Sequence, residues 1–171
     1  PIIPILKDLN RPLDFSLAFK GHGKNVEIPL LELSDERYLD VQGNLSLLNW
    51  DAKHDMFIQA ELKNLSVTQP GIRYFMDNLT GSVPSILDRM EFVRFKGSAG
   101  GYFHDLQVGG LLQTAAGAVD ANLLINSDLD FKRTYSGGVK SKNLNLGKLL
   151  GDSKFGHTQF NVDLKGFNYN D

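Results

Sequence analysis

Histidines and carboxylates are the side chains of this sequence with the most direct chemical uses. The histidines occur singly, at His22, His54, His104 and His157. No two have the HxH or HExxH spacing of a metal site, so each is expected on the surface or at the lip of a groove. A glycan-acting enzyme or lectin is one reading of the acidic side chains, but hydrolysis needs two carboxylates about 5 to 9.5 Å apart. The sequence does not pair the candidates for such a site, which are Glu61, Asp105, Asp120 and Asp163.

Three other segments resemble catalytic or ligand-binding motifs but lack essential positions. His104-Asp105 has the residue types of a base and its orienting acid, without a GxSxG elbow. GHGKN (21–25) lacks the spacer and the Ser/Thr of a phosphate loop, and indicates a hairpin turn. DLDFKRTYSGG (128–138) lacks the closing Glu of a calcium loop, and indicates turns. The sequence therefore predicts no catalytic residue, no metal, no cofactor and no enzyme.

The composition argues against a nucleic-acid partner, and the opening of the chain indicates a segment of a longer protein. The formal net charge is −2 and the pI is near 6.1, whereas nucleic-acid binding needs a basic face. The absence of cysteine excludes disulfides and thiolate metal sites. The chain opens with PIIPILKDLNRP, without Met or a signal peptide, and no apolar run approaches the roughly 18 residues of a membrane helix.

Apolar residues alternate with period two through most of the chain, which is typical of strands with one buried face. FSLAFKG (15–21) and HDLQVGGLL (104–112) are two examples. The pattern predicts a mainly β fold: an antiparallel twisted sheet that forms an open groove or half-barrel from about two repeats. The expected groove lining is Leu17, Phe19, Ile28, Leu39, Val41, Leu45, Ile58, Leu62, Val93, Phe95, Leu106, Val108, Val119, Leu123, Ile125, Val139, Phe160 and Val162.

Helical signals are short and are expected at ends or corners of the sheet. They lie at 5–9, 70–79, 84–90 and 146–152. Glycine pairs inside the strand patterns indicate bulges, bends or tight turns, at Gly100-Gly101, Gly109-Gly110 and Gly137-Gly138. Trp50 lies in a segment that resembles a hairpin turn, so an exposed indole is expected there.

Similar strand endings recur along the chain as LAFKG, VRFKG and VDLKG, which end at Gly21, Gly97 and Gly166. Lys-Asn-Leu and then a short helical pattern follow the first two, as KNLSV and KNLNL. This order predicts internal repeats at approximately 13–90 and 91–154 and the start of a third at 155–171, all within a single β-groove segment. The alternative is that Lys-Gly and Lys-Asn-Leu are simply common strand exits.

The segment KNLNLGKLLGDSKFGHTQFNVDLKG (142–166) resembles the repeat junction of the TamB family, within the AsmA-like group of envelope proteins. The strand end 142–144, the helical turn 146–150 and the strand through Phe160 to Gly166 carry the resemblance to Bacteroidetes-type versions. KNLSVTQPGIRYFMDNLTGSV (63–83) is a looser second copy, with QPGIRYF in place of LGKLL.

The resemblance implies a long, taco-like β-groove that spans the periplasm of a Gram-negative bacterium and is anchored in the inner membrane through a segment outside this chain. It also implies phospholipid movement toward the outer membrane, outer-membrane protein assembly and secretion, and an assembly partner bound through elements outside this chain. The sequence thus predicts a groove for phospholipid acyl chains. The alternative is a structural β-sandwich or interaction scaffold whose open edges accept added strands, with edge-to-edge self-association of the fragment.

Overall fold

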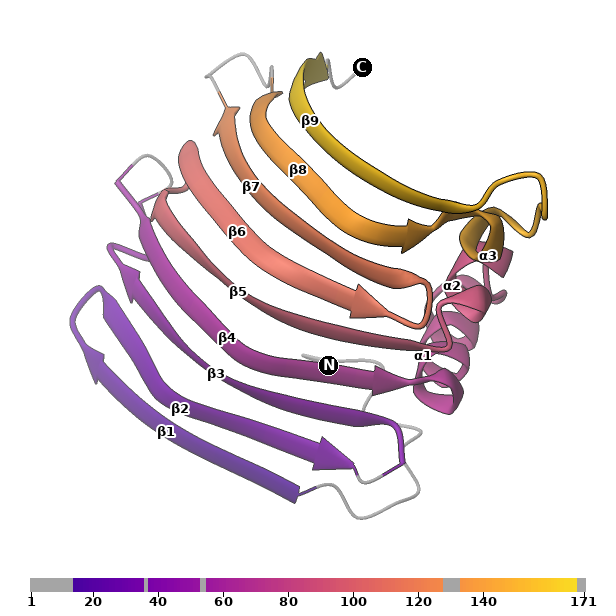
Figure 1. Ribbon diagram of the computed structural model, residues 1–171. Coiled ribbons are helices and arrows are strands. Elements are labelled where there is room, and N and C mark those ends of the chain that lie inside the picture. Colours follow the sequence, from indigo (N-terminus) through magenta and orange to yellow (C-terminus); the bar gives the residue numbers. More distant parts are fainter. Residues whose placement is uncertain (1–13, 36, 53–54, 128–132, 169–171) are drawn as a thin grey trace.

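The computed structural model describes residues 14–35, 37–52, 55–127 and 133–168 as one antiparallel sheet with three short helices. The strands lie side by side in sequence order (Figure 1), so β1 and β9 form the two edges. They are β1 (Asp14–His22), β2 (Asn25–Asp35), β3 (Leu39–Leu48), β4 (Phe57–Thr68), β5 (Phe92–Tyr102), β6 (Asp105–Thr114), β7 (Gly117–Ser127), β8 (Arg133–Asn145) and β9 (His157–Asn168). The prediction of a mainly β, antiparallel and open sheet is confirmed.

Short turns explain why consecutive strands become neighbours. Gly23, with φ 57°, and Lys24 connect β1 to β2, which confirms the hairpin turn predicted for 21–25. Phe103 and His104 connect β5 to β6 in the same way. Trp50 lies in the turn between β3 and β4 with 56% of its surface exposed, as its sequence context predicts.

All three helices lie on one side of the sheet, at the strand ends where β4 and β8 finish (Figure 1). We call this row of strand ends, with its helices, the helix edge. The helices are α1 (Gln69–Thr80), α2 (Ser85–Arg89) and α3 (Leu146–Leu150). The helices predicted at 70–79, 84–90 and 146–152 are therefore confirmed, while 5–9 lies outside the described residues. The Thr68 side chain accepts a hydrogen bond from Gly71 N at the start of α1, and Gly81 ends that helix in the left-handed conformation. No helix in the described residues is long and apolar enough to cross a membrane.

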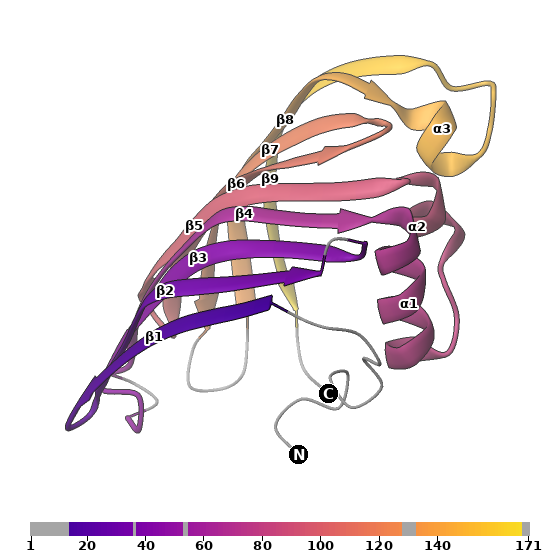
Figure 2. The ribbon, with the colours of Figure 1, turned by 90° about the horizontal axis from the view of Figure 1, so that it is seen from below.

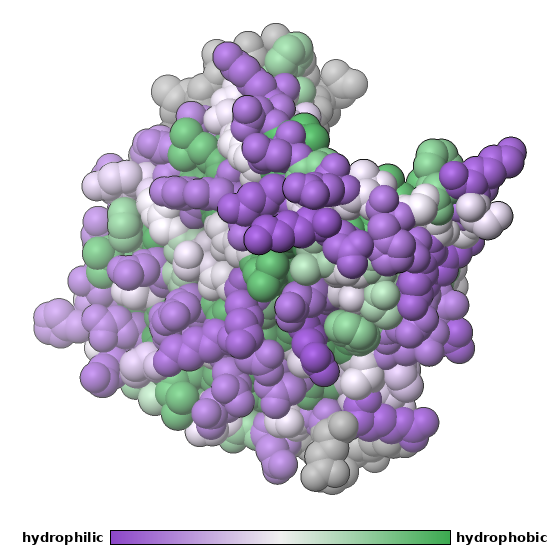
Figure 3. Space-filling view, viewed as in Figure 1, coloured by the Kyte–Doolittle hydropathy of each residue, from purple (hydrophilic) through white to green (hydrophobic). Residues whose placement is uncertain are grey.

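The sheet is arched along its strands, and α1 lies beneath one end of the arch (Figure 2). The side toward the viewer in Figure 1 is covered mostly by hydrophilic side chains (Figure 3). Helix α1 lies on the opposite, concave side (Figure 2). Near its start, a Cβ added at Gly71 would lie 3.0 Å from Val67 Cγ1. The two faces of this single layer therefore differ in curvature.

Within the described residues, the buried apolar side chains all lie at the helix edge. Ile72 of α1, Ala116 before β7 and Leu144 near the end of β8 are the buried hydrophobic residues there. Four strands followed by helix occur twice, and a ninth strand follows α3. The division into repeats at 13–90, 91–154 and 155–171 stays a prediction.

Candidate functional site: an apolar face across nine strands

The pairing register aligns the apolar residues of successive strands into rows that run across the sheet. We call the surface formed by these rows the apolar face. Two rows cross all nine strands. The first is Leu17, Leu31, Gly43, Leu62, Gly97, Gly110, Ala121, Val139 and Val162, and the second is Gly21, Val26, Leu47, Ile58, Gly101, Leu106, Ile125, Tyr135 and Gly166.

Two shorter rows lie beside these. One joins Phe15, Leu33, Val41, Leu65, Phe95, Leu112 and Val119. The other joins Ile28, Leu45, Ala60, Ala99, Val108, Leu123, Gly137 and Leu164. Because residues directly opposite each other in antiparallel strands share one face, the four rows form one continuous surface.

Every predicted lining residue lies on this apolar face. Phe19 has no register partner, because it lies opposite the irregularity of β2, but it keeps the phase of Leu17. Its ring lies 3.3 Å from where a Cβ of Gly21 would be. The structure adds residues that the predicted lining omits, among them Leu31, Leu33, Leu65, Val67 and Leu112.

Small residues occupy the middle of the apolar face. The Phe95 ring covers Gly97 and its partner Gly110, since a Cβ added to either glycine would lie 2.5 Å from the ring. Backbone oxygens of neighbouring strands also lie within 2.6 Å of both Cβ positions. Side chains at these two positions would therefore hold the strands apart and displace the ring, so glycine permits the close approach.

The apolar face is half-buried rather than sealed. Val93, Phe95, Leu106, Val108 and Leu123 all have intermediate exposure, although they lie on central strands. Neighbouring side chains of the same layer provide this partial burial, and no second sheet covers the face within the described residues. Such a surface can bind apolar groups through contact alone, without a reacting side chain.

The histidines and carboxylates form no metal-binding cluster within the described ranges. His157 contacts Asn143 Oδ1 at 2.6 Å, His104 stacks on Tyr102, and His54 lies outside the described residues. No group of three or more metal-ligating side chains is present in that part of the chain. Glu61 and Asp120 lie on β4 and β7, so their backbones are three strand spacings, or about 14 Å, apart. Residues 128–132 of the calcium-like segment lie outside the described structure.

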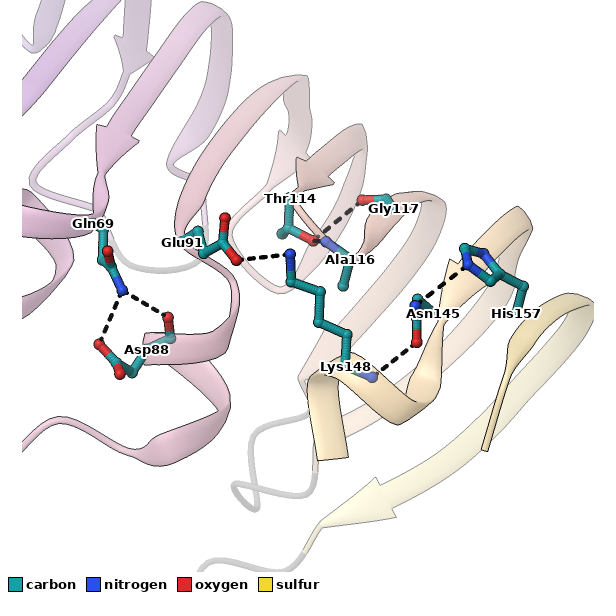
Figure 4. Close-up of polar contacts among 9 residues, drawn as sticks. All are labelled: Gln69, Asp88, Glu91, Thr114, Ala116, Gly117, Asn145, Lys148 and His157. Atoms are coloured by element: carbon teal, nitrogen blue, oxygen red, sulfur yellow. Dashed lines mark hydrogen bonds and ion pairs between the residues drawn. The ribbon is translucent and has the colours of Figure 1, made fainter. Parts of the chain in front are cut away.

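Polar contacts connect the helices along their edge of the sheet (Figure 4). Lys148 of α3 forms an ion pair of 2.7 Å with Glu91, which follows α2. Arg89 Nη1 donates a hydrogen bond to Leu149 O, where a cation is favourable near the end of a helix. These contacts hold the two helical segments of the edge together and lie apart from the centre of the apolar face.

Helices α1 and α2 are joined through an exposed carboxylate. Arg73 Nε donates to Asp88 Oδ1 at 2.7 Å. This hydrogen bond, with the positive charge of Arg73, holds the pKa of Asp88 below its usual range. The same hydrogen bond raises the pKa of Arg73. The pair therefore links α1 to α2 at the helix edge.

Comparison with known proteins assigns no relative to the chain. No protein family, curated protein or solved structure matches it.

Proposed function

We propose that this chain is a non-catalytic module whose apolar face takes up the acyl chains of phospholipids. The observation that carries the proposal is the continuity of the apolar rows, which cross the sheet in register and remain half-exposed. Contiguous exposed apolar surfaces of this extent mark interaction sites, because water makes them costly to leave uncovered.

The size of the expected interaction is sufficient for capture without polar recognition. Each methylene removed from water contributes about 0.8 kcal/mol. A tail of about sixteen carbons thus provides on the order of 10 kcal/mol before the costs of ordering are subtracted. The polar head group would stay at the hydrated rim of the sheet, while the chain lies against the rows.

The resemblance of residues 142–166 to the TamB family extends this proposal to a cellular setting. In that setting the chain is part of a periplasmic envelope protein of a Gram-negative bacterium. The acyl-chain surface would serve phospholipid movement in outer-membrane biogenesis or protein assembly. The inner-membrane anchor and the contact with an outer-membrane assembly protein would lie in elements outside this chain.

Photo-crosslinking tests the acyl-chain proposal directly. A photoreactive residue replaces Leu123, the register partner of Val108, and the protein is recovered from a Gram-negative host. We expect phospholipid in the organic extract, a crosslinked lipid adduct, and at least a tenfold lower adduct yield in Val108→Asp. Gln107→Asp is the matched control on the opposite face of the same strand, and its yield should be unchanged. Absence of bound phospholipid, or equal loss in both variants, would refute the proposal.

A second candidate function is a scaffold that binds partners by strand addition, and the open edges favour it. β9 is a 12-residue edge strand without proline, and it exposes Val162 and Leu164. Such edges pair readily with another strand. Sedimentation should then reveal an edge-to-edge dimer that Val162→Lys with Leu164→Lys dissociates. A monomer at every concentration would exclude self-association through β9.

A further inference from the structure

The hydrophilic face contains a hollow that the acyl-chain proposal does not use. It has a volume of about 900 Å³ and lies over β4 to β7. Its floor includes Gly100 and the paired residues Ser98 and Gly109, in the middle of the sheet on the face opposite the apolar rows. Because these residues are small, the longer side chains around them form walls, and the sheet is indented there.

The walls of the hollow carry groups that both donate and accept hydrogen bonds. Amide side chains come from four strands, and two carboxylates lie among them: Asn44, Gln59, Gln107, Asn122, Glu61 and Asp120. Asn44 Nδ2 donates to Glu61 Oε2 at 3.0 Å, and Gln107 Nε2 donates to Asn122 Oδ1 at 3.2 Å. These contacts orient the side chains, while each amide keeps further donor or acceptor capacity toward the hollow.

The charge of the lining restricts the class of ligand. Among the residues that the structure describes, no Lys or Arg lines this hollow. Lys140 contacts Asp120 at 3.8 Å from outside the lining. Phosphate, sulfate and other anions therefore lack a cationic partner here, whereas hydroxyl groups find both donors and acceptors.

Aromatic side chains lie at the end of the hollow that is nearest the turn between β5 and β6. Phe57 lines it and packs edge-to-face on Tyr102, with ring centroids 5.4 Å apart. Tyr102 is 49% exposed and also stacks on His104. An exposed aromatic surface beside amides and carboxylates suits a ligand with one apolar side and many hydroxyl groups.

We propose that this hollow binds a neutral oligosaccharide through the amides of Gln59, Gln107 and Asn122. The ligand hydroxyls exchange hydrogen bonds with these amides and with Glu61, and one sugar ring packs against the aromatic end. The proposed role is binding alone, with Glu61 accepting hydrogen bonds from ligand hydroxyls. The site is on the face opposite the apolar rows, so it does not depend on lipid binding.

Backbone NMR titration of the whole chain with neutral tetrasaccharides of glucose and of N-acetylglucosamine tests the proposal. We expect shift changes concentrated on β4 to β7 and millimolar affinity for at least one of these probes. Asn122→Ala should weaken binding about fivefold, the loss expected from one hydrogen bond. Gln113→Ala is the matched control, since Gln113 lies on the same face of β6 outside the hollow.

Spermidine and inorganic phosphate serve as competing ligand classes in the same titration. Neither should displace the sugar or shift β4 to β7 as strongly. The proposal is overturned if no tetrasaccharide shifts these strands, if spermidine binds there more tightly, or if Asn122→Ala and Gln113→Ala weaken sugar binding equally. Circular dichroism of both variants separates a lost contact from a lost fold, and Asn122→Gln, which keeps the amide, should restore part of the affinity.

Discussion

The free energy of unfolding of a variant with a carboxylate on the apolar face tests how exposed that face is to solvent. Val108 is half-buried on β6, so Val108→Asp forfeits about half of the ~1.5–3 kcal/mol that full burial of a valine contributes. Aspartate is also a poor strand residue, which costs up to about 1 kcal/mol. Because the new carboxylate remains hydrated, we expect the free energy of unfolding to fall by about 2 kcal/mol in total.

Two further variants are references for an exposed and a buried position, against which the Val108→Asp loss is compared. Gln107→Asp has the same strand cost without the apolar loss, so it should lower the free energy of unfolding by about 1 kcal/mol or less. Leu144 is only 6% exposed, and Leu144→Asp leaves an unpaired charge in a buried position, at a cost of about 3–5 kcal/mol or more.

Urea unfolding of lipid-free protein, followed by circular dichroism, yields the three free energies. Agreement between two spectroscopic probes first establishes that each transition is two-state. A Val108→Asp loss equal to that of Leu144→Asp would refute the reasoning, because it would mean that the apolar face is sealed in solution. A loss close to that of Gln107→Asp would support an open surface.

Two other predictions concern the backbone and the helix edge. Gly137→Ala should destabilise the protein by about 1–3 kcal/mol, since Gly137 has φ 141° and an added Cβ would meet Asn122 O. A Cβ at its neighbour Gly138 would make only an ordinary contact, 3.8 Å from Asp163 Oδ1, so thermal unfolding of Gly138→Ala should be nearly unchanged. The lowered pKa of Asp88 stabilises the α1–α2 link above the usual aspartate pKa, and that contribution is lost as acid protonates the folded carboxylate. Hydrogen exchange of α1 and α2 should therefore accelerate in Asp88→Asn at neutral pH, and further acidification should then change it less than in the original chain.

Alternation alone was sufficient to predict the strands, the open antiparallel sheet and one face of residues. On strands without a bulge the phase is simple: β6 places Leu106, Val108 and Leu112 on one side by parity alone. The short helices were equally accessible, because proline and glycine signals frame α1. Local rules of this kind act within a few residues and need no knowledge of the partner strand.

Some of the residues that the predicted lining omitted, such as Leu31 and Leu65, lie after irregularities in pairing. Leu65 is three positions from Leu62, so strict alternation assigns it to the other face. In the structure Leu62 pairs with Gly97 and Leu65 with Phe95, so β4 has one extra residue and the apolar phase is restored. In β2 the same change separates Ile28 from Leu31, across Pro29, which lacks the N–H that a regular ladder requires.

The carboxylates show the other limit of sequence reasoning. Glu61 and Asp120 do line one hollow, but the number of strands between them decides their separation, and that number follows from topology. The amides of this hollow gave no local signal, because Gln59, Gln107 and Asn122 belong to three strands and each resembles an ordinary solvent-facing residue.

The bulges also give the recurring Lys-Asn-Leu segments a physical role. On β8, Ser141 pairs with Phe160 and Leu144 with Thr158, so Lys142 and Asn143 occupy the same kind of irregularity that precedes Leu65 on β4. In both places the leucine returns to the apolar face immediately before the chain leaves the sheet for a helix. A bulge increases local twist and bends its strand, so these segments place the bend beside the helix edge on the fourth and eighth strands. Deleting Lys63 would leave one residue between Leu62 and Leu65, so regular alternation would keep both leucines on the apolar face while the bulge and its bend are lost. The apolar rows would then stay continuous, so lipid adduct formation at Leu123 should persist. Loss of the adduct would show that the bend, and not continuity of the rows alone, is needed to capture the acyl chain.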